Sequence, residues 1–323
     1  MTMQWSNIPT SDALFLPIAT LLIVVFGIAA IALVIFHVFH FTFHKNQVTK
    51  SVLSFTSFER VLWRRYLTWA IIAALFAGAF LLGPLAIAIV CACICWQSGR
   101  EYASLLGTTG SGDILIVSGW ITIGAVCLFG PSMLAYGPIL GIFVGLIVAL
   151  QLASNESVVL WIVLAGVLGF CGYLYIGLLP AFLVALSVGK MPGLVFIVGL
   201  GVALSDVGAF CVGKTLGGPR LAPRLSPNKK WSGVVGNVLG AALAPVIAPF
   251  ALPAFPLGQR VLLVLTIGLG SVCGDLLHAL FKRLSGVKDA GGLLPGFGSL
   301  LDHIDSLLLV APLVYFLTLL LWR

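Results

Sequence analysis

The chain has 323 residues, of which 60% are hydrophobic and only 8% are charged, and its mean hydropathy is +1.16. So little polar surface cannot cover a soluble globule, and the composition therefore excludes a water-soluble protein and indicates an integral membrane protein. The net charge of +7 arises mostly from short loops between apolar stretches, where Lys and Arg set topology and contact anionic headgroups. Nucleic acid is therefore not expected as a partner.

Apolar stretches of roughly 20 residues, enough to cross a bilayer as helices, follow one another along the chain. They are too long and too evenly apolar for barrel strands, which predicts an all-α polytopic membrane protein with about 8–10 transmembrane helices. The expected crossings lie near residues 14–42, 66–82, 84–97, 113–131, 138–154, 157–187, 193–212, 234–255, 260–280 and 307–322. We divide the chain into an N-terminal transmembrane region (1–110), a middle transmembrane region (111–192) and a C-terminal transmembrane region (193–323).

Three basic loops decide the expected sidedness. They cover residues 45–65, 214–230 and 282–288, and the positive-inside rule places all three in the cytoplasm. Residues 157–187 must then cross a net odd number of times, although they are long enough for one and a half passes. Pro180 offers a break, which predicts one span followed by a half-helix or a tilted continuation.

Half of the ten acidic residues fall in the C-terminal region, and all of these are aspartates: Asp206, Asp275, Asp289, Asp302 and Asp305. Asp206 and Asp275 lie near the cytoplasmic ends of strongly apolar segments, where an ionised carboxylate costs a few kcal/mol unless it is paired or hydrated. Both aspartates are therefore predicted to be functional residues. The alternative is that each makes a hydrogen bond in a contact between helices.

Asp302 and Asp305 are three residues apart, so on a helix they share a face and can jointly hold a hard cation such as Mg²⁺. A solvated helix start is the alternative. The loop "GKTLGGPRLAPRLSPNKKW" adds five cations, Lys214, Arg220, Arg224, Lys229 and Lys230. Cations beside clustered carboxylates are typical of a polyphosphate and Mg²⁺ site, because the cations hold phosphate oxygens while the metal bridges them to Asp.

The stretch "GAFCVGKT" (208–215) fits the nucleotide-binding pattern G-x-x-x-x-G-K-[ST]. A P-loop needs a glycine-rich turn whose backbone N–H groups point at phosphate. Here the intervening residues are apolar and end a predicted transmembrane helix, whose own amides are engaged. The sequence therefore predicts no P-loop, although Lys214 can still reach phosphate from the helix end.

Two longer stretches carry a family resemblance: "SDVGAFCVGKTLGGPRLAPRLSPNKKWSG" and "GDLLHALFKRLSGVKDAGGLLPGFGSLLDHIDSLL". Their order of motifs, D-x-x-A-[FY], G-[KR], S-P-x-K-x-W, G-D, K-R, K-D, L-P-G and D-x-x-D, resembles the signature blocks of the phosphatidate cytidylyltransferases, also called CDP-diacylglycerol synthases. "GREYASLL" (99–106) resembles a shorter feature of that family. The first span and residues 110–190 resemble the family only in hydropathy.

The resemblance implies an enzyme that transfers CMP from CTP to phosphatidic acid and releases pyrophosphate, with Mg²⁺ at a cytoplasm-facing site and a second cation left open. It implies carboxylates around the metal at Asp206, Asp275, Asp302 and Asp305. It implies triphosphate contacts from Ser226, Lys229, Lys230, Lys214 and the other basic residues of that loop. It implies that Lys282, Arg283, Lys288 and Asp289 position the two phosphate-bearing substrates.

Three motifs depart from the family pattern, at four positions. Phe297 and Ser299 stand in "LPGFGS", where the family usually has L-P-G-H-G-G; His303 stands in place of the Arg of D-R-x-D; and Ala279, beside His278, replaces a common Ser. Losing an Arg between two aspartates removes a permanent cation and a bidentate phosphate contact, which His does not fully replace near pH 7. The carboxylates and most lysines remain, which favours an active enzyme.

Several alternatives stay open. The same chemistry on another lipid phosphate, a catalytically inactive relative that acts as a binding partner, and a transporter or channel are the competing hypotheses. A transporter predicts polar residues along a trans-bilayer path, whereas here they gather on one side of the C-terminal region. A homodimer stays open as well. We expect a multi-pass protein of the bacterial cytoplasmic membrane, with the endoplasmic reticulum as the alternative.

Overall fold

The computed structural model describes residues 13–27, 30, 67, 70–106, 109–153, 159–189, 192–252, 255–284 and 299–321. Within them the chain is almost wholly helical, which confirms the all-α prediction. Six helical stretches are long and apolar enough to cross a membrane: Ser111–Phe129, Pro131–Gln151, Val159–Val188, Gly193–Thr215, Leu257–Leu284 and Leu301–Leu321. Shorter apolar helices are Ala13–Gly27, Ala70–Leu82 and Trp231–Ile247. The chain is therefore an integral, multi-pass membrane protein.

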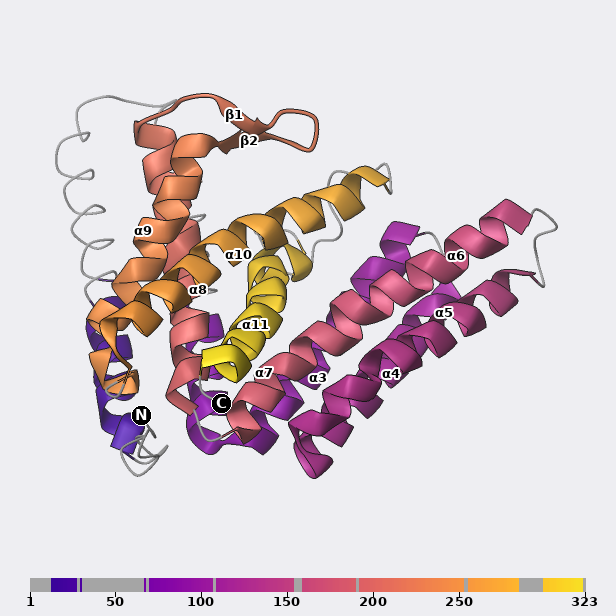
Figure 1. Ribbon diagram of the computed structural model, residues 1–323, viewed down its shortest axis with the longest axis horizontal. Coiled ribbons are helices and arrows are strands. Elements are labelled where there is room, and N and C mark those ends of the chain that lie inside the picture. Colours follow the sequence, from indigo (N-terminus) through magenta and orange to yellow (C-terminus); the bar gives the residue numbers. More distant parts are fainter. Residues whose placement is uncertain are drawn as a thin grey trace, which may run out of the picture.

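The labelled helices fall into two neighbouring groups (Figure 1). The first contains α3 (Pro84–Leu106), α4 (Thr109–Phe129), η2 (Pro131–Tyr136), α5 (Gly137–Ala153), α6 (Val159–Gly172), η3 (Tyr173–Leu178) and α7 (Leu179–Val188). The second contains α8 (Pro192–Thr215), β1 (Arg220–Ala222), β2 (Ser226–Lys230), α9 (Trp231–Ile247), η4 (Pro249–Ala251), α10 (Leu257–Leu284) and α11 (Leu301–Leu321). Contacts of α7 with α11 and with α8 join the two groups. The division at residues 110 and 192 stays a prediction.

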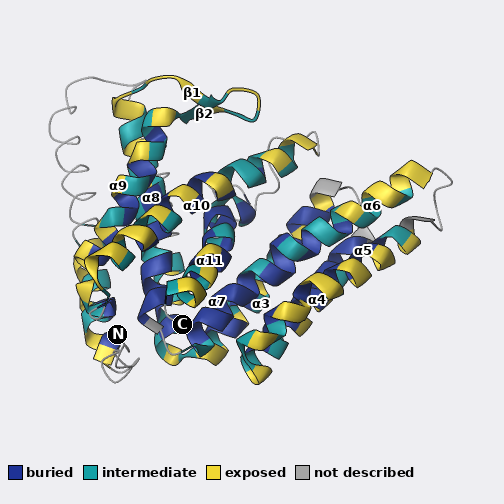
Figure 2. Cartoon of the chain, viewed as in Figure 1, coloured by how far each residue is buried: buried dark blue, intermediate teal, exposed yellow. Residues whose placement is uncertain are grey.

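Burial follows what a lipid solvent requires. The inner faces of the helices are buried, while the outer faces of α4, α5 and α6 are exposed (Figure 2). Their exposed side chains include large apolar ones such as Leu128, Ile142 and Val163. In water such a surface would favour aggregation, but in a bilayer it contacts hydrocarbon at no cost.

The expected break at Pro180 is wrong. Val159–Val188 is one continuous helical stretch, because a π-helical segment, η3, precedes the proline. The wider turn shifts the hydrogen bonding, so that the backbone N–H of Leu179 donates to the carbonyl of Leu174. A π segment absorbs the missing N–H of Pro180 without interrupting the helix. The stretch is therefore long and apolar enough for a single crossing, and one crossing is compatible with the odd number that the sequence predicts.

The basic loop after α8 is a small antiparallel hairpin and not an irregular connection. Gly217 and Gly218 end α8 with positive φ angles of 66° and 105°, a conformation that glycine adopts without a steric penalty. In the hairpin, β1 pairs with β2 through the register Arg220 to Lys230. The hairpin lies across the ends of α8 and α9 (Figure 1), and α8 carries Asp206.

Close helix contacts depend on glycine in α10. A Cβ added to Gly268 would lie 2.8 Å from the Cα of Val238 in α9, and one added to Gly270 would lie 2.9 Å from a methyl group of Val310 in α11. Small residues at such positions let membrane helices approach closely. Gly268 and Gly270 therefore let α10 pack closely against α9 and α11.

The Gly268→Ala variant is expected to lower stability in detergent by about 1–3 kcal/mol, because the added methyl group forces α9 and α10 apart. Gly124→Ala is the matched control: that helix interior has no heavy atom within 4 Å of an added Cβ, and alanine favours a helix by about 0.5–1 kcal/mol over glycine. Thermal unfolding of both purified variants checks the prediction. Equal melting temperatures would contradict it.

Candidate active site

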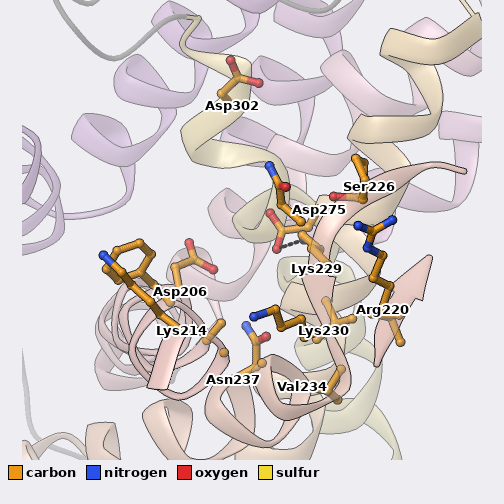
Figure 3. Close-up of a pocket in the computed structure, with 18 of the residues that line it drawn as sticks. Asp206, Lys214, Arg220, Ser226, Lys229, Lys230, Val234, Asn237, Asp275 and Asp302 are labelled. Carbon is orange, nitrogen blue, oxygen red and sulfur yellow. Dashed lines mark ion pairs between the residues drawn. The ribbon is translucent and has the colours of Figure 1, made fainter. Parts of the chain in front are cut away.

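A cavity of about 780 Å³ lies where α8, α9, α10 and α11 meet the hairpin. Three of its lining residues are acidic, and the basic ones come from the end of α8 and from the hairpin (Figure 3). The charged and polar lining residues are Asp206, Lys214, Arg220, Ser226, Asn228, Lys229, Lys230, Asn237, Asp275, Asp302 and His303. Residues distant in sequence therefore converge on one pocket of mixed charge.

Lys229 lies at the centre of the carboxylates. It forms an ion pair with Asp275, and it also interacts electrostatically with Asp206 and Asp305. These aspartates belong to α8, α10 and α11, so carboxylates from three helices interact with one ammonium group. Figure 3 shows Asp206, Asp275 and Lys229 around the pocket. A single lysine does not balance three carboxylates, so this arrangement favours a further cation.

Asp302 and Asp305 have different hydrogen-bond and ion-pair partners. The Oδ1 atom of Asp302 accepts a hydrogen bond from His278 Nε2 at 2.9 Å and forms an ion pair with Lys282, and both partners lie on α10. The Oδ2 atom of Asp302 accepts a hydrogen bond from the backbone N–H of Ser299 at 3.4 Å. Asp305 is buried, and its Oδ1 accepts from the N–H of Ser306 at 2.7 Å.

The expected joint use of Asp302 and Asp305 is not what this geometry shows. Three residues along a helix leave the two carboxylates about 60° apart around the axis. This divergence is enough to give them different partners: Asp302 meets Lys282, whereas Asp305 faces the group around Lys229.

Among the residues that the structure describes, no three His, Cys, Asp or Glu side chains form a group that could hold a metal ion by themselves. The predicted set of four metal-binding carboxylates is therefore not assembled as one ligand cluster. A Mg²⁺ ion that works on phosphate is usually held by one or two carboxylates together with phosphate oxygens and water. Asp206 and Asp275 interact with one another and fit this smaller protein share of a metal site.

Of the other predicted cations, some line the cavity and others bind groups of the protein itself. Lys214 lies in the last turn of α8, with its Nζ 5.4 Å from the Phe210 ring centroid, and lines the pocket with Lys230 of the hairpin. Arg283 instead donates from Nε to the carbonyl of Leu225 at 3.2 Å, so it holds the hairpin turn. Lys282 pairs with Asp302.

Two predicted residues, Lys288 and Asp289, lie outside the described residues, as does Phe297. The P-loop interpretation is settled by the backbone. Residues 208–215 are helical in α8, and the Thr215 hydroxyl donates to the carbonyl of Cys211 at 2.8 Å. No phosphate-binding turn exists there, as the sequence predicted.

Sequence reasoning missed two buried polar contacts. Asn237 of α9 lines the pocket and donates from Nδ2 to Ser205 Oγ of α8 at 2.8 Å. Glu101 of α3 accepts hydrogen bonds from Leu300 and Leu301 at the start of α11. For Asn237 the available signal was a polar residue inside an expected span, because such residues need a partner in the bilayer. Glu101 lies beyond the span expected at residues 84–97, and its only signal was its place in the stretch "GREYASLL".

A second, apolar cavity of about 360 Å³ adjoins the first. Its walls come from the helices 13–27 and 70–82 and from α8 and α11, with side chains such as Phe76 and Leu307. Asp206 and His303 line both cavities. A charged compartment and an apolar compartment therefore meet at these two residues.

Comparison with known proteins identifies several relatives. The chain is 41% identical over 143 residues to a phosphatidate cytidylyltransferase of Pseudomonas aeruginosa, which covers 42% of this chain and 52% of the relative. It is 40% identical over 112 residues to the enzyme of that name from Brucella suis (34% and 41%), and 34% identical over 120 residues to that from Rickettsia bellii (35% and 52%). The matches thus span about half the length of these relatives, or less.

A family model described as "Cytidylyltransferase family" matches residues 63–321. This range contains α3 to α11, the hairpin and every charged residue of the pocket described above. On that match over most of its length, the chain belongs to the cytidylyltransferase family.

Proposed function

We propose that the protein transfers CMP from CTP to phosphatidic acid and forms CDP-diacylglycerol and pyrophosphate. The observation that carries this proposal is the junction of the two cavities at Asp206 and His303. A nucleoside triphosphate needs cations and a metal ion, whereas a lipid phosphate needs a charged site for its headgroup and an apolar site for its chains. The adjoining cavities meet both needs. The relatives named phosphatidate cytidylyltransferase support the same reaction.

In this proposal the protein mainly brings two anions together. A phosphate oxygen of the lipid attacks the α-phosphorus of CTP, a new P–O bond forms, and the bond to the β-phosphate oxygen breaks, so that pyrophosphate leaves. Lys214, Arg220 and Lys230 line the cavity and can neutralise the triphosphate. Alignment and charge neutralisation provide most of the catalysis in phosphoryl transfer, because the lipid phosphate is already a nucleophile.

Asp206 and Asp275 would hold Mg²⁺, completed by phosphate oxygens of the substrates, with Asp305 adding negative charge behind them. A bound divalent cation would neutralise charge that develops on the phosphates. Lys229 keeps these carboxylates together through its pair with Asp275.

We further propose that the site faces the cytoplasm of a bacterial cell. The hairpin and the basic end of α10 contact one another through Arg283 and Leu225, so two basic segments lie on the same side of the molecule. The positive-inside rule assigns that side to the cytoplasm, where CTP is available. Assembly into a homodimer stays a prediction from the sequence.

The apolar cavity does not specify one lipid. Apart from Asp206 and His303, its lining is hydrophobic or glycine, and such a surface discriminates weakly between chains that differ by a few methylenes. Another lipid phosphate with the same headgroup chemistry is therefore the second candidate substrate.

The test is to incubate the purified protein in detergent with Mg²⁺, labelled CTP and either phosphatidic acid or an isoprenoid-ether lipid phosphate. Formation of labelled CDP-diacylglycerol supports the proposal. Product from the ether lipid alone would favour the second candidate. No product from either lipid, while an authentic relative is active in the same assay, would overturn it.

The Asp302→Asn variant is expected to lower the turnover about 10–100-fold, a range that is typical for residues that support a metal site from outside it. The reason is that Asn keeps the size of the side chain but loses the charge that pairs with Lys282 and bonds His278. Initial rates at saturating CTP check the prediction, and Ala279→Ser, a change beside His278, is the control. Wild-type turnover in Asp302→Asn would show that the pairing is dispensable.

A further inference from the structure

The start of α11 is held by a residue about 200 positions earlier in the chain. The backbone N–H groups of Leu300 and Leu301 each donate to a carboxylate oxygen of Glu101, at 3.0 Å to Oε1 and 3.0 Å to Oε2. The first amides of a helix have no partner within the helix. A carboxylate that accepts two of them makes charge-assisted bonds and complements the positive end of the helix dipole.

The next amides of α11 are satisfied locally. The N–H of Asp302 donates to Ser299 Oγ at 3.2 Å, while the N–H of Ser299 donates to Asp302 Oδ2 at 3.4 Å, a reciprocal arrangement that resembles a capping box. The N–H of His303 donates to the carbonyl of Leu300 at 3.0 Å. Local residues therefore satisfy the amide of Asp302, whereas Glu101 satisfies those of Leu300 and Leu301 and so completes the helix cap.

Glu101 is itself firmly placed. Its side chain is only 5% exposed, and Gln97, one turn earlier in α3, donates from Nε2 to Oε1 at 2.9 Å. The neighbouring Tyr102 donates its hydroxyl to the carbonyl of Leu168 in α6 at 3.0 Å and stacks edge-on against Phe281 of α10 at 5.8 Å. This end of α3 thus contacts α6, α10 and α11.

We propose that Glu101 is a positioning residue of the active site. It fixes the first turn of α11 and thereby sets where Asp302 meets Lys282 and where Asp305 faces the Lys229 group. Glu101 does not line the cavity and acts only through the helix. The inference rests on the proposed function for its effect on turnover, whereas its effect on the helix start is independent of any substrate.

The discriminating variant is Glu101→Gln, which keeps the volume of the side chain. Three donors, from Gln97, Leu300 and Leu301, converge on the carboxylate, so an amide turned either way presents its own N–H to another donor. We expect the Mg²⁺ concentration for half-maximal activity to rise, or turnover to fall, about 10–100-fold, as for other residues that orient a metal site. Glu101→Asp restores the charge and should give an intermediate value.

A second readout needs no substrate. Hydrogen exchange of the amides at residues 300–302, measured by mass spectrometry on the purified full-length protein, should accelerate about tenfold or more in Glu101→Gln. Arg100→Gln is the matched control: Arg100 is exposed, its guanidinium lies 5.5 Å from the Trp96 ring, and it touches neither α11 nor the cavity. It should leave both readouts unchanged.

The outcomes separate the two proposals. If the wild type forms no CDP-lipid, the proposed function fails, and the exchange measurement alone decides whether Glu101 holds the helix start. If the wild type is active and Glu101→Gln matches it in Mg²⁺ dependence, turnover and exchange, the positioning role is overturned. Loss of turnover with unchanged exchange at 300–302 would also overturn it, because the effect would not pass through α11.

Discussion

Replacement of Lys229 with methionine is expected to reduce turnover about 10²–10³-fold, the cost typical of removing one preorganised electrostatic group from an active site. Lys229 pairs with Asp275 and also balances Asp206 and Asp305. Methionine has a similar length but no charge, so three carboxylates would face one another without a lysine between them. Repulsion between the carboxylates would move them apart, in the site that has to bind an anionic substrate.

Initial rates with labelled CTP and phosphatidic acid, measured beside Arg100→Gln, check this prediction. The double variant Lys229→Met with Asp275→Asn is the more informative comparison. Because the two groups act as a pair, the double variant should lose much less than the sum of the two single losses in activation free energy. Additive losses would show that Lys229 and Asp275 act on the reaction separately.

Asp206→Asn is expected to lower turnover at least about 100-fold while leaving the melting temperature unchanged or higher. Within the described part of the chain, the Asp206 carboxylate has no hydrogen bond or ion pair, and it repels Asp275. Neutralising it therefore removes no hydrogen bond or direct ion pair, and the repulsion from Asp275 that it relieves is larger than the attraction to Lys229 that it gives up. Function and stability should move in opposite directions, as expected for a group retained for its ligand.

Thermal unfolding with and without Mg²⁺ and CTP tests the reason behind this expectation. A ligand that binds only the folded state raises its stability, so the wild type should gain more in melting temperature than Asp206→Asn. If Asp206→Asn unfolds at a lower temperature and gains as much from Mg²⁺ and CTP as the wild type, then Asp206 is a structural carboxylate.

The charge arrangement explains why the pocket needs all four C-terminal helices. Each of α8, α10 and α11 contributes a carboxylate near Lys229, and α9 contributes Asn237 and the glycine-mediated contact with α10. The hairpin closes this group with its basic residues. Changes that displace α11, such as those at Glu101, are therefore expected to act on the same site as changes to the aspartates themselves.

Properties that depend on local composition could be determined from the sequence alone. The membrane character, the approximate spans and the expected side of the basic loops follow from hydropathy and charge, because each segment contacts lipid or water according to its own side chains. Exclusion of a P-loop at residues 208–215 followed for the same reason, since apolar residues at a span end continue the helix. The order of motifs also sufficed to indicate the family.

Properties that depend on direction around a helix were decided only by the tertiary structure. Asp302 and Asp305 are close in sequence, yet the first pairs with Lys282 and the second faces Lys229, because helix crossing sets which neighbour each side chain meets. The contact between Glu101 and α11 joins residues about 200 positions apart, and no local pattern specifies such a pair. Likewise, no local pattern predicted the π segment before Pro180. Sequence thus determined what kind of site this protein carries, and packing decided which residues form it.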